Sequence, residues 1–497
     1  MHLDLSADAL IAVLTSPHML LVLLVGVCVG LFFGIMPGLG GKLGLVFLIP
    51  FTFGMDPAAG AIFLLAMHSV VHTSGAIPSI LFGIPGTGPD AATIIDGFPM
   101  AKNGEAGRAL GATLFASGVG GVIGAVFLTL MLPFAGPAVL AFGPAEFFFL
   151  ALLGITFIAA LSGKSLLKGV IVGLFGLLIS CVRLDPLTAE SRYTYNQLFL
   201  WDGVDAVTAV IAIFAIPEII ALGAKLEVGF AIGDAKNVYD FRSVWRGCMD
   251  VFRHWSLTLR TSVIGAVIGM IPGLGGDVAT WVCYGHAVQS SKSPERFGKG
   301  AVEGVIAPET ANNSKEGGAL LPTLYFGIPG SASMAIMLGA LVTLGIQPGP
   351  HLAESGSQLV WVLIWTLAIS NILAVVLLLA CAPWFSRLAS IRAEFLVPFV
   401  LVLSLAGSYL GSGAWQNFIV LLILGGVGYL LKKSDWPLPP FVVGIVLGPI
   451  AETSLNKAMM IWGPGFVLRP FSLMLLGFIV VTVAGYFYRA WKPRVKK

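Results

Sequence analysis

Long apolar segments follow one another along almost the whole chain, with only short polar stretches between them. They lie at 19–36, 42–53, 59–82, 109–132, 144–162, 166–182, 204–224, 260–285, 318–346, 357–382, 394–412, 414–431, 438–458 and 467–488. A helix that crosses a bilayer needs about 20 such residues. Charged residues make up only 11% of the chain, whereas a soluble domain carries about 25%. The sequence therefore predicts an all-α integral membrane protein.

Three motifs occur once in each half of the chain, in the same order. The first contains Pro-Gly-Leu-Gly-Gly, the second contains Phe-Gly-Ile-Pro-Gly, and the third is Ala-Glu-Phe. They occupy residues 34–41 and 269–276, 78–86 and 322–330, and 145–147 and 393–395. One match could arise by chance, but three in the same order indicate a duplicated unit.

The distribution of Lys and Arg predicts that the two copies face opposite sides of the membrane. Loop 54–60 contains neither residue type, whereas loop 97–108 contains both. In the second half the order is reversed, because 286–316 is basic and 347–358 contains neither. The basic residues of 286–316 are Lys292, Arg296, Lys299 and Lys315. Since cytoplasmic loops are enriched in Lys and Arg, this pattern indicates an inverted repeat.

The same rule orients the rest of the chain. It places the charged stretch 225–260 and the C-terminus in the cytoplasm, and the N-terminus in the periplasm. These orientations agree with one another if 19–53 and 260–285 each enter the membrane and return to the same side, with Pro-Gly-Leu-Gly-Gly at the turn of the hairpin. The alternative is that each segment makes two short full crossings. The predicted fold is two inverted repeats with re-entrant or broken helices, about 11 crossings plus two hairpins.

Four regions follow from this topology. Residues 1–224 form the first membrane repeat, and residues 225–259 form a cytoplasmic linker. Residues 260–462 form the second, inverted repeat, and residues 463–497 add one helix and a basic tail.

The repeated motifs also supply a candidate binding site. Proline and clustered glycines end a helix and leave backbone N–H and C=O groups without partners. Inside a membrane such groups are tolerated only where protein or a wet cavity satisfies them, and at half-helix ends they bind ions. The predicted backbone ligands are Gly38, Gly40, Gly41, Gly273, Gly275 and Gly276. Close helix packing is the alternative, and it is favoured for Gly30 and Gly265.

Amide and hydroxyl side chains beside the second motif complete the predicted site. They bind carboxylate oxygens or Na⁺ without the cost of burying a fixed charge. For each residue the alternative is that it caps a helix. The predicted side-chain ligands are Ser74, Thr87, Asn312, Asn313 and Ser331.

The remaining polar residues predict neither a catalytic site nor a metal site. His68 and His72 have metal-ligand spacing, but no third ligand is nearby in the sequence, so no metal is predicted. The chain has neither HExxH nor GxSxG, so we expect no catalytic residues and no enzyme. A net charge of +3 gives no strong field for nucleic acid. Glu146 and Glu394 are interpreted as acids at helix starts, with proton carriage left open for Glu218 and Glu452.

Taken with the repeats, four further runs resemble the large membrane subunit of the tripartite tricarboxylate transporters, the TctA type. These runs are 96–104, 297–300, 307–313 and 326–350. The resemblance implies a bacterial inner-membrane permease for a carboxylate, driven by Na⁺ or H⁺ and needing no other cofactor. Its implied partners are a small membrane subunit and a periplasmic solute-binding protein. A stand-alone transporter or a channel for a small organic anion is the alternative.

Two stretches depart from the pattern of that family. Residues 72–75 read His-Thr-Ser-Gly where the family often has Tyr-Gly-Gly, and residues 314–316 read Ser-Lys-Glu where it usually has small residues. Both lie beside the predicted site. The resemblance therefore leaves the substrate open beyond its being a carboxylate.

Overall fold

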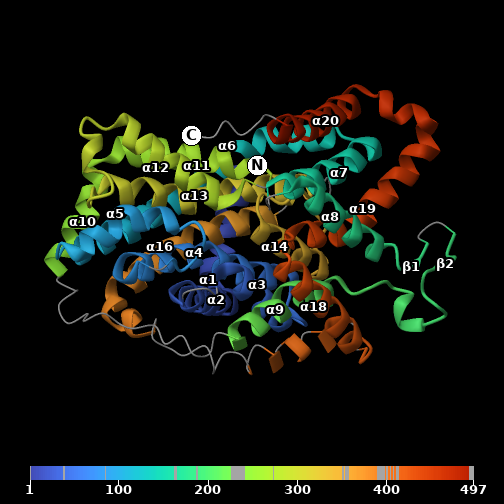
Figure 1. Ribbon diagram of the computed structural model, residues 1–497, viewed down its shortest axis with the longest axis horizontal. Coiled ribbons are helices and arrows are strands. Elements are labelled where there is room, and N and C mark those ends of the chain that lie inside the picture. Colours follow the sequence, from blue (N-terminus) through green and yellow to red (C-terminus); the bar gives the residue numbers. More distant parts are fainter. Residues whose placement is uncertain are drawn as a thin grey trace.

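A computed structural model describes residues 2–36, 40–83, 85–161, 165–185, 188–224, 241–272, 274–349, 352, 358–388, 398, 401–402, 404–406, 408–409 and 414–491. Helices dominate these residues, and the described strands pair as one antiparallel hairpin. Figure 1 shows this hairpin projecting from one end of the helical body. The predicted all-α class is confirmed.

The described elements fall into two series, one on either side of residues 225–240. The first series is α1 (His2–Thr15), α2 (Pro17–Ile35), α3 (Gly40–Leu48), η1 (Ile49–Thr52), α4 (Pro57–Phe82), α5 (Ala91–Lys102), α6 (Ala106–Leu140), α7 (Pro144–Leu161), α8 (Leu166–Ser180), β1 (Arg183–Leu184), β2 (Ser191–Arg192), η2 (Leu198–Leu200) and α9 (Ala206–Ala224). The second is α10 (Phe241–Arg253), α11 (Trp255–Met270), α12 (Gly275–Ser290), η3 (Pro294–Arg296), α13 (Glu303–Phe326), α14 (Ala332–Thr343), α16 (Gln358–Leu388), α18 (Asn417–Lys433), α19 (Pro439–Trp462), η5 (Gly463–Leu468) and α20 (Pro470–Trp491).

Phe-Gly-Ile-Pro-Gly ends a helix in the same way in both halves. α4 stops at Phe82 because Gly83 adopts φ +65°, and α13 stops at Phe326 because Gly327 adopts φ +66°. Each capping glycine donates its N–H to the carbonyl of a proline inside its helix. Glycine adopts this left-handed conformation without a steric penalty, so it ends the helix sharply. The predicted breaks are therefore present.

Pro-Gly-Leu-Gly-Gly separates two helices in both halves. The first motif lies between α2 and α3, and the second lies between α11 and α12. Gly40 opens α3 at φ +62° and Gly275 opens α12 at φ +60°. Gly38 and Gly273 lie outside the described residues. The chain thus breaks at both motifs, while the choice between a hairpin and two short crossings stays a prediction.

Corresponding helices pack closely in the two halves, and glycines make this possible. α2 lies along α4, and α11 lies along α13. A Cβ on Gly30 would meet the Val70 side chain at 2.6 Å, and a Cβ on Gly265 would meet Cα of Ala311 at 2.6 Å. No side chain fits at these distances, so the packing role expected for both glycines is confirmed.

The long helices cross between the halves. α6 of the first half packs along α13, and α16 of the second half packs along α4. A Cβ on Gly124 of α6 would lie 2.7 Å from the carbonyl oxygen of Ser314, so the two backbones nearly touch. α4 and α13 therefore lie at the centre, each held by a helix of the other half.

Four described helices are long and apolar enough to span a bilayer, and a bent pair adds a fifth. They are Pro17–Ile35, Pro57–Phe82, Ala106–Leu140 and Gln358–Ala380, with Pro439–Leu468 and Pro470–Ala484 bent by 64°. Other apolar helices, such as α8 and α11, are shorter. The chain is thus a multi-pass membrane protein, whereas the count of about 11 crossings and the opposite orientation of the repeats stay predictions.

The basic stretch 286–316 is not one loop, contrary to the prediction. α12 continues to Ser290 and α13 begins at Glu303. Lys315 therefore lies inside α13. Its side chain packs against α4, so only 3% of its surface is exposed. The other basic residues of the stretch, Lys292, Arg296 and Lys299, remain exposed between the helices. The proposed linker also contains a helix, α10, which Asp250 ties to Arg108 of α6 at 2.6 Å.

Candidate functional site

Buried polar side chains gather where α4 meets α13, at the centre of the molecule. Such groups are expensive to bury unless they pair with one another. The most exposed member has only 8% of its surface accessible. We call this set the central polar cluster, which consists of His68, His72, Thr73, Thr87, Asp90, Asn312, Asn313, Lys315 and Glu316.

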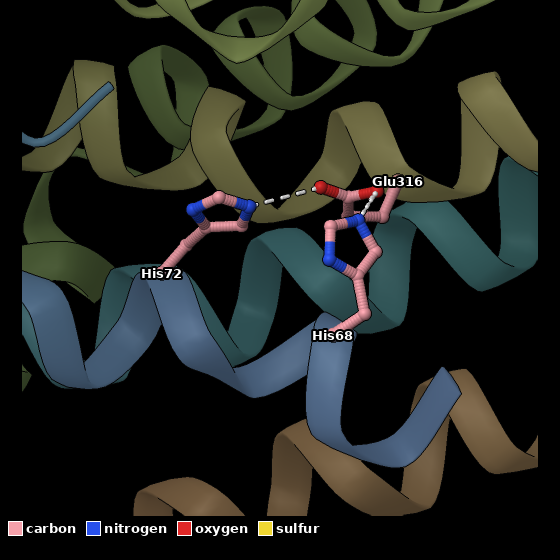
Figure 2. Close-up of side chains that lie close together, drawn as sticks. All are labelled: His68, His72 and Glu316. Atoms are coloured by element: carbon pink, nitrogen blue, oxygen red, sulfur yellow. Dashed lines mark hydrogen bonds and ion pairs between the residues drawn. The ribbon is translucent and has the colours of Figure 1, made fainter. Parts of the chain in front are cut away.

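Two histidines of α4 face one carboxylate of α13. His68 and His72 lie four residues apart, so they share one face of the helix, and Figure 2 shows both rings directed toward Glu316. Nε2 of His68 lies 3.1 Å from Oε2 of Glu316, and Nε2 of His72 lies 3.2 Å from Oε1. All three ligand atoms fall within 4.8 Å of one another. The expectation that the histidines lack a third ligand was wrong, because the partner comes from the other half.

Lys315 supplies a cation to the same group. Its Nζ donates to Oε1 of Glu316 and lies 3.3 Å from Nε2 of His72. The space between His68, His72 and Glu316 therefore already faces the positive charge of Lys315. A metal ion fits His68, His72 and Glu316 by ligand type, but only if the Lys315 ammonium moves away.

Asp90 joins the second-motif loop to α13. Its Oδ2 accepts hydrogen bonds from the Thr87 hydroxyl at 2.7 Å and from the Thr87 N–H at 2.8 Å. Its Oδ1 accepts from Nδ2 of Asn312 at 2.9 Å. Both carboxyl oxygens of Asp90 are therefore engaged by groups that can donate. Thr87 and Asn312 were both predicted ligands, and the fold brings them to one acid that sequence reasoning did not select.

Asn313 ties α13 to helices on both sides. Its Nδ2 donates to Oγ1 of Thr73 at 2.7 Å and to Oδ1 of Asn371, on α16, at 2.6 Å. Within the described part of the chain, the side-chain amide oxygens (Oδ1) of Asn312 and Asn313 are buried without a hydrogen-bond partner. A buried acceptor without a donor is costly, so both oxygens are available to a cation or a donor group that enters the cluster.

Two further buried carboxylates flank the cluster. Glu309 on α13 accepts from the hydroxyls of Thr93 and Ser117, the second at 2.8 Å. Asp96 on α5 accepts from the Ala301 N–H at 2.8 Å and the Tyr284 hydroxyl at 3.0 Å. Both acids are satisfied by donors from other helices, so they connect α5 and α6 to α12 and α13.

Comparison with known proteins identifies the family. Residues 20–443 match the tripartite tricarboxylate transporter TctA family. The chain belongs to the TctA family. It is also 32% identical over 465 residues to an Agrobacterium vitis protein described as an uncharacterized 52.8 kDa protein in the TAR-I ttuC' 3' region, covering 93% of this chain and 92% of that protein. No solved structure matches this chain.

A second relative from Agrobacterium vitis is shorter. It is described as an uncharacterized protein in the TAR-II ttuC' 3' region, and it is 33% identical over 222 residues. That match covers 44% of this chain and 92% of the relative. The TctA family is a transporter family, and it provides the membrane component of tripartite tricarboxylate transporters.

The two stretches expected to depart from the TctA pattern meet in the fold. His72 belongs to the first departure, and Lys315 and Glu316 belong to the second. The three side chains contact one another directly. The charged part of the central polar cluster therefore comes largely from the two stretches in which a departure from the family pattern is expected.

The predicted glycines form the wall of the cluster where they are described. A Cβ on Gly41 would lie 3.5 Å from Nδ1 of His68, and one on Gly276 would overlap the Lys315 stem. Gly40 and Gly275 lie one position earlier, beside Thr87 and Ser331 respectively. Larger residues at these positions would fill space that the cluster now uses. Their role in binding stays a prediction.

Two predicted side chains are used locally. The hydroxyl of Ser331 accepts from the Met334 N–H at 3.2 Å and caps α14, which is the alternative considered for it. The hydroxyl of Ser74 donates to the carbonyl of Val71 in its own helix at 3.2 Å. Asn312 and Asn313 cap no helix, because both lie inside α13.

The other glutamates lie away from the cluster. Glu146 accepts from the Gly143 N–H at the start of α7 and pairs with Arg469 at 2.9 Å, so the helix-start interpretation holds. Glu452 pairs with Arg183 at 2.7 Å and Arg192 at 2.5 Å, which fixes it beside the β-hairpin. The side chains of Glu218 and Glu394 lie outside the described residues.

Proposed function

We propose that this chain is the uptake permease of a tripartite carboxylate transporter in a bacterial inner membrane. An ion gradient drives it, and it works with a small membrane subunit and a periplasmic solute-binding protein that delivers the carboxylate. The N-terminus is periplasmic and the C-terminus is cytoplasmic. Membership of the TctA family supports this assignment.

The observation that carries the proposal is a buried polar cluster to which both halves of the chain contribute donors. Thr87 follows the break after α4, and Asn312 and Asn313 lie inside α13. Donors of both halves thus converge at one buried place. Neutral donors and broken helix ends are the groups by which secondary transporters hold an anion within the membrane.

The cluster also explains how a carboxylate is held without a permanent excess of positive charge. An isolated charge inside a membrane is expensive, so the empty site must be neutral to change its accessibility. The amides of Asn312 and Asn313 meet this condition. Lys315 meets it as well, because Glu316 balances its charge in the closed cluster.

Uptake into proteoliposomes tests the proposal. The chain is reconstituted with its small membrane subunit, and the binding protein is added outside with radiolabelled citrate or with other mono-, di- and tricarboxylates. We expect accumulation of one carboxylate only when all three proteins and an ion gradient are present. Accumulation without the binding protein would instead support a stand-alone transporter. Uptake that stops when the internal concentration of the carboxylate equals the external one would support a channel.

A further inference from the structure

The helix of the linker, α10, has three different faces. A helix turns by about 100° per residue, so residues three or four apart share a face. The first face is buried against the beginning of α6, where Sγ of Cys248 lies 3.5 Å from the carbonyl oxygen of Gly111. The buried residues of α10 are Val244, Gly247, Cys248, Asp250 and Val251. Protein contacts thus account for this face.

The second face is apolar and exposed. Phe241, Trp245 and Phe252 have 70%, 59% and 56% of their surface exposed. They stand four and seven residues apart, so they lie on one side of the helix. Aromatic side chains gathered in this way mark a surface that meets another protein or a membrane.

The third face is basic. Arg242, Arg246 and Arg253 are exposed and also stand four and seven residues apart. They lie next to the aromatic face and opposite the buried one. The one acid in the sequence of α10, Asp250, is buried and pairs with Arg108 and Arg253, so the exposed charge of the helix is positive. Aromatic residues beside arginines are typical of a helix that lies in the surface plane of a membrane.

Two contacts with α6 orient these faces relative to the membrane. α6 is among the helices long and apolar enough to span it. Asp250 contacts Arg108 in the first turn of α6 at 2.6 Å, whereas the ring of Phe252 lies 5.1 Å from that of Phe115, about two turns further along α6. The aromatic face therefore points along α6 into the membrane. The arginines lie between these two directions, on the side away from α6, where lipid headgroups would be.

We propose that α10 is a lipid-binding helix whose arginines hold the phosphate groups of anionic phospholipids. Phe241, Trp245 and Phe252 then enter the boundary between headgroups and acyl chains. Charge complementarity favours this partner, because a basic face without an exposed acid matches a uniformly negative surface, and the arginine fork fits phosphate oxygens. The inference goes beyond the proposed function and needs only the membrane location of the chain.

The position of α10 gives the bound lipid a structural role. α10 packs on α6 of the first half, and the chain passes from it through His254 directly into α11 of the second half. A lipid held by α10 therefore anchors the junction between the two halves at the membrane surface. Figure 1 shows this junction at the end of the helical body opposite the β-hairpin.

Lipid selectivity of the purified full-length chain tests the inference. Native mass spectrometry during a titration compares phosphatidylglycerol with phosphatidylcholine at the tightest site. Arg242→Gln combined with Arg246→Gln keeps good helix formers at both positions. Each arginine near an anionic surface favours binding about fivefold, so we expect the preference for phosphatidylglycerol to fall about 25-fold.

A matched control separates α10 from the general charge of the protein. Lys292→Gln combined with Lys299→Gln removes the same charge from the exposed loop between α12 and α13, and it should keep the preference. An equal fall in both double variants, or no fall in either, would overturn the inference. Uptake is not measured here, so a failure of the proposed function would leave this result unchanged.

Nitroxide labels locate the helix in vesicles of phosphatidylcholine and phosphatidylglycerol. In a background without native cysteines, a label on Trp245→Cys should be relaxed mainly by oxygen, which concentrates among acyl chains. A label on Arg246→Cys should be relaxed mainly by a water-soluble nickel complex. Relaxation of both labels by nickel would overturn the assignment. So would dipolar coupling between labels on two copies, or a loss of oxygen relaxation on adding the small membrane subunit, because protein would then cover this face.

Discussion

Nε2 of His68 and Oε2 of Glu316 lie 3.1 Å apart, although 248 positions separate them in the chain. The contact joins the central helix of one half to the central helix of the other. It also buries a carboxylate that is 1% exposed. The two halves are therefore joined by charged groups at the place where neutral donors also converge, and the predictions below concern the members of that contact region.

Replacing Asn313 by Ala should weaken carboxylate binding. The change leaves the Thr73 hydroxyl and the Asn371 carbonyl without their shared donor, and it removes an amide from the cluster. We expect the apparent substrate constant to rise by about 5- to 150-fold, which corresponds to about 1–3 kcal/mol for an unpaired buried group. Initial uptake rates measure it. Asn103→Ala, on the exposed end of α5, should leave the constant unchanged, and an equal effect of both changes would contradict the prediction.

Lys315 should be needed for a stable fold as well as for transport. Lys315→Ala leaves the Glu316 carboxylate buried without its cation, and removal of one partner of a buried pair costs about 3–5 kcal/mol. We expect a low yield and a lowered unfolding temperature in detergent. Fluorescence-detected size-exclusion chromatography after heating measures this temperature. The double change to Lys315→Ala and Glu316→Ala should recover part of the loss. Lys102→Ala removes an exposed lysine and serves as the control.

Valine at Gly40 or Gly275 should stop transport. Both glycines have positive φ, near +60°, which a β-branched residue adopts only with strain. We expect inserted protein with uptake reduced at least about tenfold. Gly426→Val is the matched change, because that glycine has open space around it and no positive φ. Normal uptake by both Gly40→Val and Gly275→Val would remove these turns from the mechanism.

Cysteine labelling should place the two repeats in opposite orientations. In a background without native cysteines, Ala58→Cys should react with an impermeant reagent from the periplasm. Glu295→Cys, in the exposed basic loop between α12 and α13, should react only after the membrane is opened. Labelling of both positions from one side would refute the inverted repeat.

His254 should stabilise the fold only at acidic and neutral pH. Glu303 bonds to His254 and raises the pKa of that imidazole, and His254 together with Arg296 lowers the pKa of Glu303 to about 2. A raised pKa gives stability that is present below the ordinary value of about 6.5 and lost as pH rises through the folded value. His254→Gln should therefore lower the unfolding temperature more at pH 6 than at pH 9. The thermal curve of His18→Gln gives the baseline, and an equal loss at both pH values would rule out the charged pair.

The sequence located the helix breaks but not the charged partners of the site. Gly83 and Gly327 end helices where Phe-Gly-Ile-Pro-Gly predicted breaks, because proline and glycine act on their own local backbone. Asn312 and Asn313 were selected because they precede the second motif in the sequence, although the structure places both inside α13. Their contacts with Asp90, Thr73 and Asn371 could not be predicted, because pairing across helices depends on how the helices pack.

Lys315 shows why charge patterns mislead within such a chain. It was counted with the neighbouring loop lysines as a marker of the cytoplasmic side, because single-sequence reasoning treats every Lys near an apolar segment as solvated. Its adjacent acid, Glu316, was the available signal. An opposite charge next to it in an otherwise apolar or small-residue run indicates a pair that is buried together.

The crossed packing of α6 on α13 and of α16 on α4 also determines which parts of the protein can move as rigid bodies. A division at the middle of the sequence would separate backbones that nearly touch, such as those of Gly124 and Ser314. α16 packs along α6 as well as along α4, so α4, α6, α13 and α16 form one connected group of helices that draws on both halves. A rigid body that keeps this group intact contains helices encoded by both ends of the gene, so its boundary does not coincide with the boundary of the duplication.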